Sequence, residues 1–512
     1  MTTPREGALA GLAAGAVTLG TAELLAAAWV RLLAGAGVPS PLLAVGAAFV
    51  DLTPAWLKDW AVTTFGTADK VALGVGMALT LTLICAGLGA LSSRHRTLGL
   101  GLFAVVGLVG MAAVVTRPSS GPLDATPTVV GVLVGSWLLG RLLDRGAHPT
   151  PQAGGASRRE LLQTAGGLTV LGVVGIAAGQ ALSTAGRAAD RAARAIGLPR
   201  PTREVTVPAG AVSDLAEHTA YLTPNDSFYR IDTALRVPRV DPDGWRLKVT
   251  GLVEREVEIS YAELLEEEHV EALVTLTCVS NTVGGDLVGN ARWQGWPVRE
   301  LLARAGVRPE ADMVLSRSVD GWTAGTPIEA LTDDRDALLA VAMNGEPLPA
   351  QHGFPVRLVV PGLYGYVSAT KWVTELKVTR FDADEGYWTP RGWSALGPIK
   401  TASRIDVPRD RARVAAGEVV VAGVAWAQHR GIEAVEVQVD EEVWRPAELL
   451  DQPTVDAWRL WRWTWPEATP GDHVLRVRAT DGAGEVQTAD VAAPAPDGAS
   501  GWHTVRVRVV GS

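Results

Sequence analysis

The sequence predicts a multi-domain chain with an N-terminal α-helical membrane region, an α+β domain and a C-terminal β-sandwich. Residues 1 to about 200 of the 512 are rich in Ala, Leu, Gly and Val and carry few charges. Residues from about 205 to 400 mix short β-like runs with short helical patterns, and alternating strands dominate after residue 405. The net charge of −9, without a basic stripe of interleaved aromatic residues, argues against nucleic-acid binding.

The first part of the chain contains five stretches that approach the roughly 20 apolar residues of a membrane-spanning helix. Their expected bounds are about 8–34, 71–92, 97–116, 127–144 and 164–185. We assign residues 1–150 to a membrane region of about four helices, and residues 151–204 to a fifth helix with a linker. Charges and Pro54 interrupt the apolar patches of 39–66, which predicts an interfacial or re-entrant segment.

Cationic loops orient these helices, because positive charge gathers on the cytoplasmic side of a membrane. The two cationic loops contain, respectively, Arg94, His95 and Arg96, and Arg141, Arg145, Arg158 and Arg159. Both loops fall inside if the N-terminus is also inside. Five spans then place everything after residue 185 outside the cytoplasm.

Two features of the membrane region allow two interpretations each. The run Ser157-Arg158-Arg159-Glu-Leu-Leu, followed by an apolar stretch, resembles a twin-arginine export signal, but its arginines also suit a positive-inside loop. Glu23 in the first helix is either a functional intramembrane carboxylate or a side chain that faces neighbouring helices.

Residues 205–400 predict an α+β domain with many turns that contain Gly or Pro. The β-like runs are Trp245–Val249, Leu273–Thr277, Val356–Val360 and Trp372–Val378. The helical patterns are Tyr261–Glu268 and Val298–Ala305.

Residues 401–512 predict an immunoglobulin-like sandwich, because about 100 residues of short strands at regular spacing are typical of that architecture. The period-2 runs are Glu418–Trp426, Ala434–Val439, His473–Arg478 and Trp502–Val509. The domain has no Cys pair, so the pattern predicts architecture alone. The tryptophans of 457–465 are expected to serve core and edge packing rather than a ligand site.

Cys278 is the one cysteine of the polar part of the chain, since Cys85 lies in an apolar run. No disulfide framework is implied. Cys278 ends a β-like run, Thr275-Leu-Thr-Cys278, just before the Gly-rich stretch Gly284–Asn290. On position alone, it is either a small buried hydrophobe or a working thiolate.

Four segments carry a family resemblance. They are Tyr221–Arg230, Thr275–Gly295, Ser318–Thr323 and Met343–Trp372. The last is the most specific, because it joins His352-Gly-Phe-Pro-Val-Arg357, Pro361-Gly362 and Ser368-Ala-Thr-Lys371-Trp372 without gaps. Together the segments resemble the sulfite oxidase family of molybdenum enzymes, in a bacterial, membrane-anchored form. The resemblance covers about 205–510, and the sandwich is similar to that family's dimerisation domain, which implies a homodimer.

The resemblance implies a molybdenum–molybdopterin cofactor, with Cys278 as the ligand that the protein gives to the metal. A metal-bound thiolate is deprotonated and needs no disulfide partner. The pterin carries a phosphate, which suits cationic and hydroxyl donors and a close glycine backbone. The cofactor-binding positions that the resemblance implies are Asn225, Tyr229, Ser280, Asn281, His352, Arg357, Gly362, Gly365, Ser368 and Lys371.

The substrate positions depart from the family pattern. Arg230 falls where the family's substrate-binding arginine occurs, but the chain continues Ile-Asp where sulfite oxidases have Asn-His. After the cysteine it reads Ser280-Asn281-Thr-Val instead of Gly-Asn-Arg-Arg, and Trp322 stands near a position where relatives often have Tyr. With fewer cations, the site is expected to hold sulfite less well. Arg292 remains open between pocket and core.

The predicted function is oxygen-atom transfer to or from a small sulfur- or nitrogen-containing substrate by an extracytoplasmic, membrane-anchored oxidoreductase. Cys278 and Arg230 are the expected catalytic residues. None of the eight histidines lies within a predicted span, and no Cys-x-x-Cys-His motif occurs, so a separate electron-transfer protein or quinone-linked carrier is expected. One alternative is a membrane-tethered binding or sensor module on this fold without turnover. The other is a cysteine-nucleophile enzyme with His352 as base.

Overall fold

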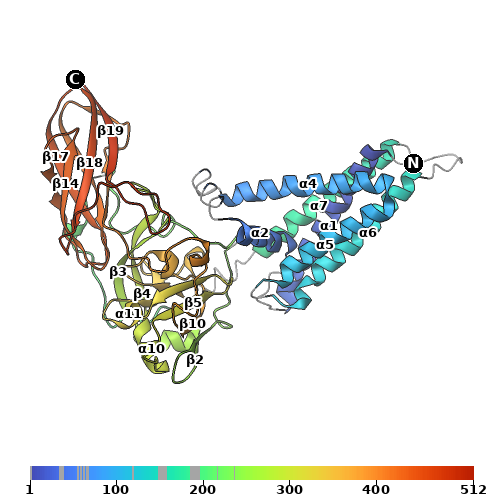
Figure 1. The fold of residues 1–512 in the computed structure, drawn as a ribbon, viewed down its shortest axis with the longest axis horizontal. Helices are drawn as coiled ribbons and strands as arrows, with labels where there is room; N and C mark the ends of the chain where they lie inside the picture. Colours follow the sequence, from blue (N-terminus) through green and yellow to red (C-terminus); the bar gives the residue numbers. More distant parts are fainter. Residues whose placement is uncertain are drawn as a thin grey trace. The chain divides into compact units, whose positions relative to one another are not determined.

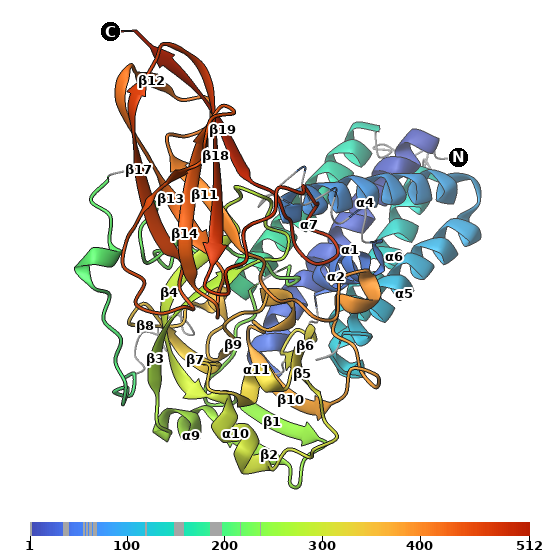
Figure 2. The ribbon, with the colours of Figure 1, turned by 60° about the vertical axis from the view of Figure 1, so that its left-hand side comes forward.

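The structure, a computed structural model, describes residues 3–33, 40–54, 69–117, 120–147, 158–184, 197–215, 217–235 and 237–511, with the single positions 57, 60 and 64. The chain divides into two compact units. The first is Met1–Ala188 with Thr233–Arg236, and the second is Ala189–Asp232 with Val237–Ser512 (Figures 1 and 2).

In the part of the first unit that the structure describes, five helical stretches are long and apolar enough to cross a membrane, as the sequence predicts. They are Pro4–Trp29, Lys70–Arg94, Arg96–Val115, Pro122–Asp144 and Gln163–Ala181. They belong to α1 (Pro4–Leu33), α4 (Asp69–Arg94), α5 (Arg96–Val115), the short turn η2 (Pro122–Ala125) with α6 (Thr126–Ala147), and α7 (Arg158–Thr184). A shorter apolar helix, α2 (Pro41–Leu52), lies in the interrupted 39–66 segment.

Small residues let α1 pack closely against its neighbours. A Cβ atom on Gly89 of α4 would lie 2.1 Å from the carbonyl oxygen of Gly7 in α1. A Cβ atom on Gly172 of α7 would lie 2.4 Å from the carbonyl carbon of Ala16 in α1. Helices in a membrane associate through such close backbone contacts, because lipid is as apolar as the side chains.

Glu23 is buried in this bundle and faces neighbouring elements. Its Oε1 accepts a hydrogen bond from Ser40 Oγ at 2.7 Å and another from the Leu42 amide at 3.3 Å. Ser40 is the N-cap of α2, so the carboxylate of Glu23 stabilises the start of that helix.

The run that predicts an export signal begins at the edge of the described residues. Ser157 is among the residues that the structure does not describe, and the description resumes with Arg158 as the first residue of α7. The linker expected at the end of 151–204 also lies outside the described residues as far as residue 196. Its described part, residues 197–204, is not helical.

The α+β part of the second unit contains two sheets. The first has the order β2-β1-β10-β5-β6, in which β1 and β10 are parallel and the other pairs are antiparallel. The second has the order β3-β4-β7-β8, with β9 paired to β7. Their strands are β1 (Arg246–Gly251), β2 (Val257–Ser260), β3 (Val270–Thr277), β4 (Val288–Pro297), β5 (Met313–Ser318), β6 (Thr323–Pro327), β7 (Leu338–Met343), β8 (Glu346–Pro347), β9 (Arg357–Val359) and β10 (Val373–Thr379).

Three short α-helices accompany these sheets. They are α9 (Tyr261–Glu266), α10 (Val298–Ala305) and α11 (Glu329–Thr332). Helix α10 has the bounds that the sequence predicts, because Pro297 precedes it and Gly306 ends it with a left-handed φ of +72°. Leu301 and Leu302 of α10 are fully buried and join the core formed with both sheets.

The last hundred residues form two sheets that share one core. One sheet has the order β11-β13-β17-β16, and the other has the order β12-β19-β18-β14-β15. The strands are β11 (Ala402–Val407), β12 (Arg413–Ala415), β13 (Gly417–Trp426), β14 (Ile432–Val439), β15 (Arg445–Pro446), β16 (Glu448–Leu449), β17 (Arg459–Ala468), β18 (Gly471–Asp481) and β19 (His503–Val510). Alternate residues of β18 and β19 are buried, as their period-2 pattern predicts. The C-terminus lies at the end of this sandwich distant from the α+β sheets (Figures 1 and 2).

The tryptophans of 457–465 serve packing. Trp461 and Trp465 are buried in the core between the two sandwich sheets. Trp458 is buried between the sandwich and the α+β part, and its Nε1 donates to the Tyr221 carbonyl at 2.9 Å.

The sandwich docks directly on β3, the strand that leads to Cys278. The amide of Trp458 donates to Thr275 Oγ1 at 2.8 Å, and the Thr275 amide donates to the Asp456 carbonyl at 3.0 Å. Gln428 Nε2 donates to the Thr275 carbonyl at 2.8 Å and to Thr277 Oγ1 at 3.0 Å. Loops of the sandwich therefore fix the end of β3.

Candidate functional site

Cys278 is the first residue after β3, and its backbone is held on both sides. Its amide donates to the Leu287 carbonyl at 2.9 Å, and its carbonyl accepts from the Asn281 amide at 3.0 Å. Burial raises the pKa of the Cys278 thiol, while hydrogen bonds from Ser280 and the charge of Lys371 oppose this rise. The raised pKa keeps the thiol protonated at neutral pH, and a bound metal ion would displace the proton.

Arg357 is a buried cation without a carboxylate partner among the described residues. Its guanidinium donates only to carbonyl oxygens, those of His352 at 3.1 Å, Leu358 at 3.3 Å and Ala369 at 3.4 Å. Its Cζ lies 5.0 Å from the centre of the Trp293 ring. Burial lowers the pKa of Arg357 to about 10, so it stays charged at neutral pH. A buried charge of this kind requires an anion.

His352 presents an open acceptor in the same place. Its ring is fully buried, and Nε2 lies 2.8 Å from the Asn225 carbonyl oxygen. A carbonyl only accepts, so Nε2 carries the proton and Nδ1 has a free lone pair. Nδ1 is buried and has no hydrogen-bond partner in the described part of the chain. Burial and the charges of Arg357, Lys371 and Arg230 lower the pKa of His352 to about 4, which keeps the ring neutral.

Gly353 brings His352, Arg357 and Lys371 close together. Its φ of +114° lies in the left-handed region that favours glycine. A Cβ atom on Gly353 would lie 2.9 Å from Cβ of Arg357 and 3.2 Å from Cα of Lys371. A larger residue would therefore push these two cations apart from the histidine.

Asp232 joins Arg230 to Lys371. Arg230 donates from Nε to Asp232 Oδ2 at 2.8 Å and from Nη2 to Oδ1 at 3.1 Å. Lys371 Nζ lies 3.0 Å from Asp232 Oδ2. Burial lowers the pKa of Lys371 to about 8, and Asp232 opposes the change. Burial raises the pKa of Asp320, and the negative charge of nearby Asp232 raises it further.

The structure thus brings six of the predicted residues into one cluster of electrostatically interacting side chains, which we call the pocket. They are Cys278, Tyr229, Arg230, His352, Arg357 and Lys371. Burial and the charge of Cys278 raise the pKa of Tyr229, whereas the charge of Arg357 lowers it. Ser280 contacts Cys278, and Asn225 holds His352 through its carbonyl.

The other predicted residues shape the backbone rather than point free polar groups at the pocket. Asn281 Oδ1 accepts from the Leu287 amide at 2.9 Å, and Ser368 Oγ donates to the Tyr364 carbonyl at 3.0 Å. A Cβ on Gly362 would lie 3.1 Å from Cβ of His429 in the sandwich, and one on Gly365 would lie 3.9 Å from the Thr277 carbonyl. Arg292 Nε lies 3.6 Å from Glu271 Oε1, so the two side chains form an ion pair.

Two residues of the pocket were not predicted. Asp232 follows Arg230 by two positions, and in an extended segment such residues share a side, so the spacing could have predicted the pair. Trp293 lies under Arg357, but no sequence signal joins a β4 residue to the start of β9.

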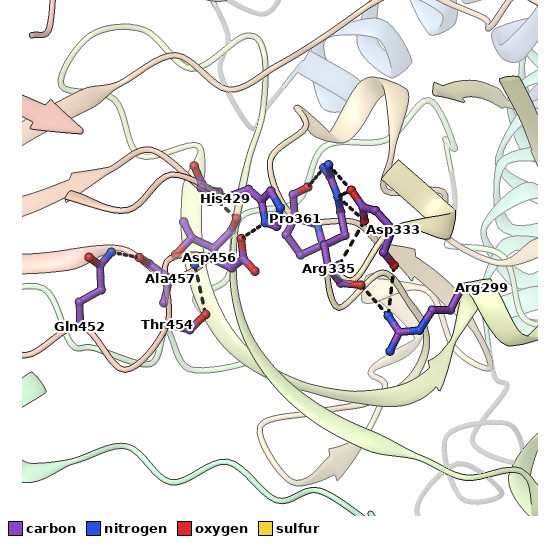
Figure 3. A network of polar contacts seen from close by, with 11 residues as sticks. Arg299, Asp333, Arg335, Pro361, His429, Gln452, Thr454, Asp456 and Ala457 are labelled. Atoms are coloured by element: carbon purple, nitrogen blue, oxygen red, sulfur yellow. Dashed lines mark hydrogen bonds and ion pairs between the residues drawn. The ribbon is translucent and has the colours of Figure 1, made fainter. Parts of the chain in front are cut away.

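A separate group of potential metal ligands lies beside the sandwich. Asp333, Asp334 and His429 offer atoms within 4.8 Å of one another. However, Arg335 donates from Nε to both oxygens of Asp333 at 2.9 Å, and His429 Nδ1 contacts Asp456 Oδ1 at 3.2 Å (Figure 3). These contacts make the group an ion-pair network.

The pocket fits a pterin cofactor with a phosphate. Within the described ranges, no carboxylate pairs with Arg357 and no group donates to His352 Nδ1, and Cys278 would supply one soft thiolate ligand to a metal such as molybdenum.

Comparisons with known proteins agree with this fit. Residues 234–388 match the oxidoreductase molybdopterin binding domain. The chain is 30% identical over 345 residues to mitochondrial sulfite oxidase of Rattus norvegicus, which covers 57% of this chain and 62% of the rat protein. It is 30% identical over 321 residues to sulfite oxidase of Gallus gallus, which covers 53% of this chain and 69% of that protein. The chain thus spans less than two thirds of the rat protein's length.

A solved structure shares the fold. The crystal structure of the sulfane dehydrogenase SoxCD from Paracoccus pantotrophus matches with a TM-score of 0.51 at 23% identity, over 62% of this chain and 92% of that one. From the matching domain and the relatives together, the chain belongs to the sulfite oxidase family of molybdopterin-dependent oxidoreductases.

Proposed function

We propose that this chain is a membrane-anchored enzyme that transfers an oxygen atom to or from a small sulfur- or nitrogen-containing substrate outside the cytoplasm. The observation that carries the proposal is the buried guanidinium of Arg357, which has no carboxylate partner in the described chain and lies in one pocket with the Cys278 thiol. An anionic cofactor would remove the cost of this buried charge.

When bound, the molybdenum cofactor would supply two-electron redox chemistry and oxygen-atom transfer. Arg357 would hold its phosphate, and His352 would accept a hydrogen bond from an N–H group of the pterin at Nδ1. Cys278 would bind the metal as a thiolate. Arg230 would orient the polarised oxygen of the substrate and stabilise negative charge that develops there.

The same proposal covers the membrane region, the C-terminal sheets and the electron carrier. The five apolar helices would anchor the enzyme in the membrane, with the catalytic part outside as the cationic loops suggest. The C-terminal sheets would form an immunoglobulin-like, dimerisation-type domain. A separate electron-transfer protein or a quinone-linked carrier would exchange electrons with the cofactor one at a time.

The cysteine-nucleophile alternative is less well supported. His352 would need to act as a general base near neutral pH, but its pKa of about 4 makes it a weak base. The sensor-module alternative differs from the proposal in turnover and in metal content.

The test is metal content and turnover of the full chain in detergent. The protein is expressed in cells that load other molybdenum enzymes, and molybdenum is measured by mass spectrometry. Sulfite, sulfoxides and N-oxides are then offered with an artificial electron carrier. We expect about one molybdenum per chain and turnover of at least one substrate. Metal-free protein, or loaded protein that turns over none of them, would contradict the proposal.

A further inference from the structure

The carboxylate of Asp232 already accepts two of the five N–H donors of the predicted substrate arginine, Arg230. Arg230 gives Asp232 two parallel hydrogen bonds, at 2.8 and 3.1 Å, and such bidentate pairs are among the strongest in proteins. Lys371 adds a third contact at 3.0 Å. One acidic group therefore bridges two cations of the pocket.

This pairing is shielded from solvent. The side chain of Asp232 is 8% exposed and that of Lys371 is 11% exposed, whereas Arg230 is 31% exposed. Salt screens buried charges much less than surface charges. The negative charge of Asp232 is therefore felt by any ligand that approaches Arg230.

The charge of Asp232 discriminates between ligands. An oxyanion at Arg230 would lie close to the carboxylate and be repelled by it, and it could not form a bidentate pair through the Nε and Nη2 donors that Asp232 already holds. An uncharged molecule with a polarised S–O or N–O oxygen needs only one free donor and meets no net repulsion. Lys371 has three N–H donors and Asp232 receives one of them, so its ammonium can still reach the cofactor.

We propose that Asp232 is a specificity-determining residue that disfavours oxyanions such as sulfite and selects uncharged substrates with a polarised S–O or N–O oxygen. The inference rests on the proposed oxygen-transfer function and names its substrate class. Asp232 acts through the charge of the pocket and through Arg230, so it is a positioning residue rather than a catalytic one.

The test compares ligand binding to the loaded wild-type chain and to Asp232→Asn, which preserves shape and removes the charge. Sulfate serves as an unreactive oxyanion and dimethyl sulfoxide as an uncharged oxide, and calorimetry measures sulfate binding. We expect Asp232→Asn to bind sulfate about tenfold more tightly or better, since one unit charge near the ligand is removed. The ratio kcat/KM for dimethyl sulfoxide should change less than the sulfate affinity.

Two further variants control the result. Asp384→Asn removes the same charge from an ammonium–carboxylate pair with Lys377, at 2.8 Å and outside the pocket, and should leave sulfate affinity unchanged. Asp232→Glu keeps the charge and should restore the weak sulfate binding of the wild type. Molybdenum content is measured for every variant. If Asp232→Asn does not load, the equally uncharged Asp232→Ser replaces it.

The outcomes separate the two proposals. Equal sulfate affinity in the wild type and in the loaded, uncharged variant would overturn the role of Asp232, whatever is turned over. Loss of metal from both uncharged variants would overturn it too, because Asp232 would then serve the fold. If loaded wild-type protein turns over neither sulfite nor oxides, the oxygen-transfer function fails, while the sulfate comparison still reports on Asp232.

Discussion

The buried charge of Arg357 is unfavourable for the cofactor-free fold but suits a site that binds an anion. In the cofactor-free protein, its charge is buried among carbonyl groups and the Trp293 ring. Such a charge destabilises a fold unless an anion accompanies it. A bound phosphate would therefore contribute to folding as well as to catalysis, because a ligand that binds only the native state stabilises it.

This argument predicts opposite effects of Arg357→Met on two measurements. The free energy of unfolding of the cofactor-free protein should rise by about 1–3 kcal/mol, because an unpaired buried charge is removed. Molybdenum content after expression with molybdate should fall to background. Denaturant unfolding of protein made without molybdate checks the first, and metal analysis checks the second.

The matched control is Arg317→Met, which breaks an exposed pair with Glu375 at 3.1 Å. It should change stability by about 0.5 kcal/mol or less and leave the metal content intact. If Arg357→Met retains molybdenum, Arg357 does not hold the cofactor.

The two cysteines give a second prediction at the residue scale. Cys278→Ser should lower turnover by about 100-fold or more, because a hydroxyl cannot replace a soft thiolate ligand. The x-ray absorption spectrum of molybdenum should show one sulfur ligand fewer. Cys85→Ser, in α4, should leave both turnover and the spectrum unchanged. Full turnover by Cys278→Ser would exclude its role as a ligand.

Motif residues and charge pairs differ in how far sequence predicts them. Cys278, His352 and Arg357 lie in ungapped motifs, so their shared pocket was an expectation before the structure. Ser368 and Asn281 occur in the same motifs, but their polar groups are used by nearby backbone. The type of a residue does not show which of two available partners its side chain will bind.

At the scale of elements, the helices were predictable because length and apolar composition decide a membrane span. The five expected spans and the candidate spans differ by only a few residues at most ends. The pairing of strands into sheets could not be predicted in the same way, because it depends on contacts between residues that are distant in the sequence. The parallel pair β1 and β10 joins Lys248 to Glu375, for which no local pattern exists.

Two glycines of α4 give a prediction for the bundle. Gly89→Val would place side-chain atoms against the backbone of Gly7 and Gly11 in α1, whose atoms lie 2.1 and 2.7 Å from the added Cβ. We expect a loss of about 1–3 kcal/mol in the stability of the bundle, because overpacking forces helices apart. Thermal melting of the detergent-solubilised chain, followed by circular dichroism, measures this.

Gly87→Val is the control, because Gly87 lies on the same helix and a Cβ atom there has no heavy atom within 4 Å. Its melting temperature should remain at or above that of the wild type, since valine replaces a flexible glycine. Equal melting temperatures for the two variants would mean that α4 does not pack on α1 at Gly89.

At the scale of the whole second unit, the sandwich supports the strand that carries the cysteine. Thr275 of β3 contacts both Gln428 and Trp458 of the sandwich, although more than 150 positions separate them in the sequence. The alternating pattern predicts the sandwich itself, but nothing local predicts this docking. The sandwich therefore helps to hold the strand that leads to Cys278, in addition to any role in dimer formation.

The two sandwich loops that dock on β3 also provide a titratable pair, one residue from each loop. His429 Nδ1 lies 3.2 Å from Asp456 Oδ1 (Figure 3). The Asp456 carbonyl also accepts a hydrogen bond from the Thr275 amide. The hydrogen bond to Asp456 raises the pKa of His429 above its ordinary value. A group whose pKa is higher in the folded state stabilises that state fully below its unfolded pKa of about 6.5. The contribution is lost as pH rises through the folded pKa.

His429→Gln should therefore destabilise the second unit more at pH 5.5 than at pH 8. The His429 side chain is 35% exposed, so the difference should be only about 0.5 kcal/mol after solvent screening. Asp456→Asn should produce the same pH dependence, and the double variant should add little to either, because both changes remove one interaction. Denaturant unfolding followed by tryptophan fluorescence measures it. A loss that is equal at both pH values would mean that His429 is uncharged in the folded protein and that the docking loops are held by their backbone contacts alone.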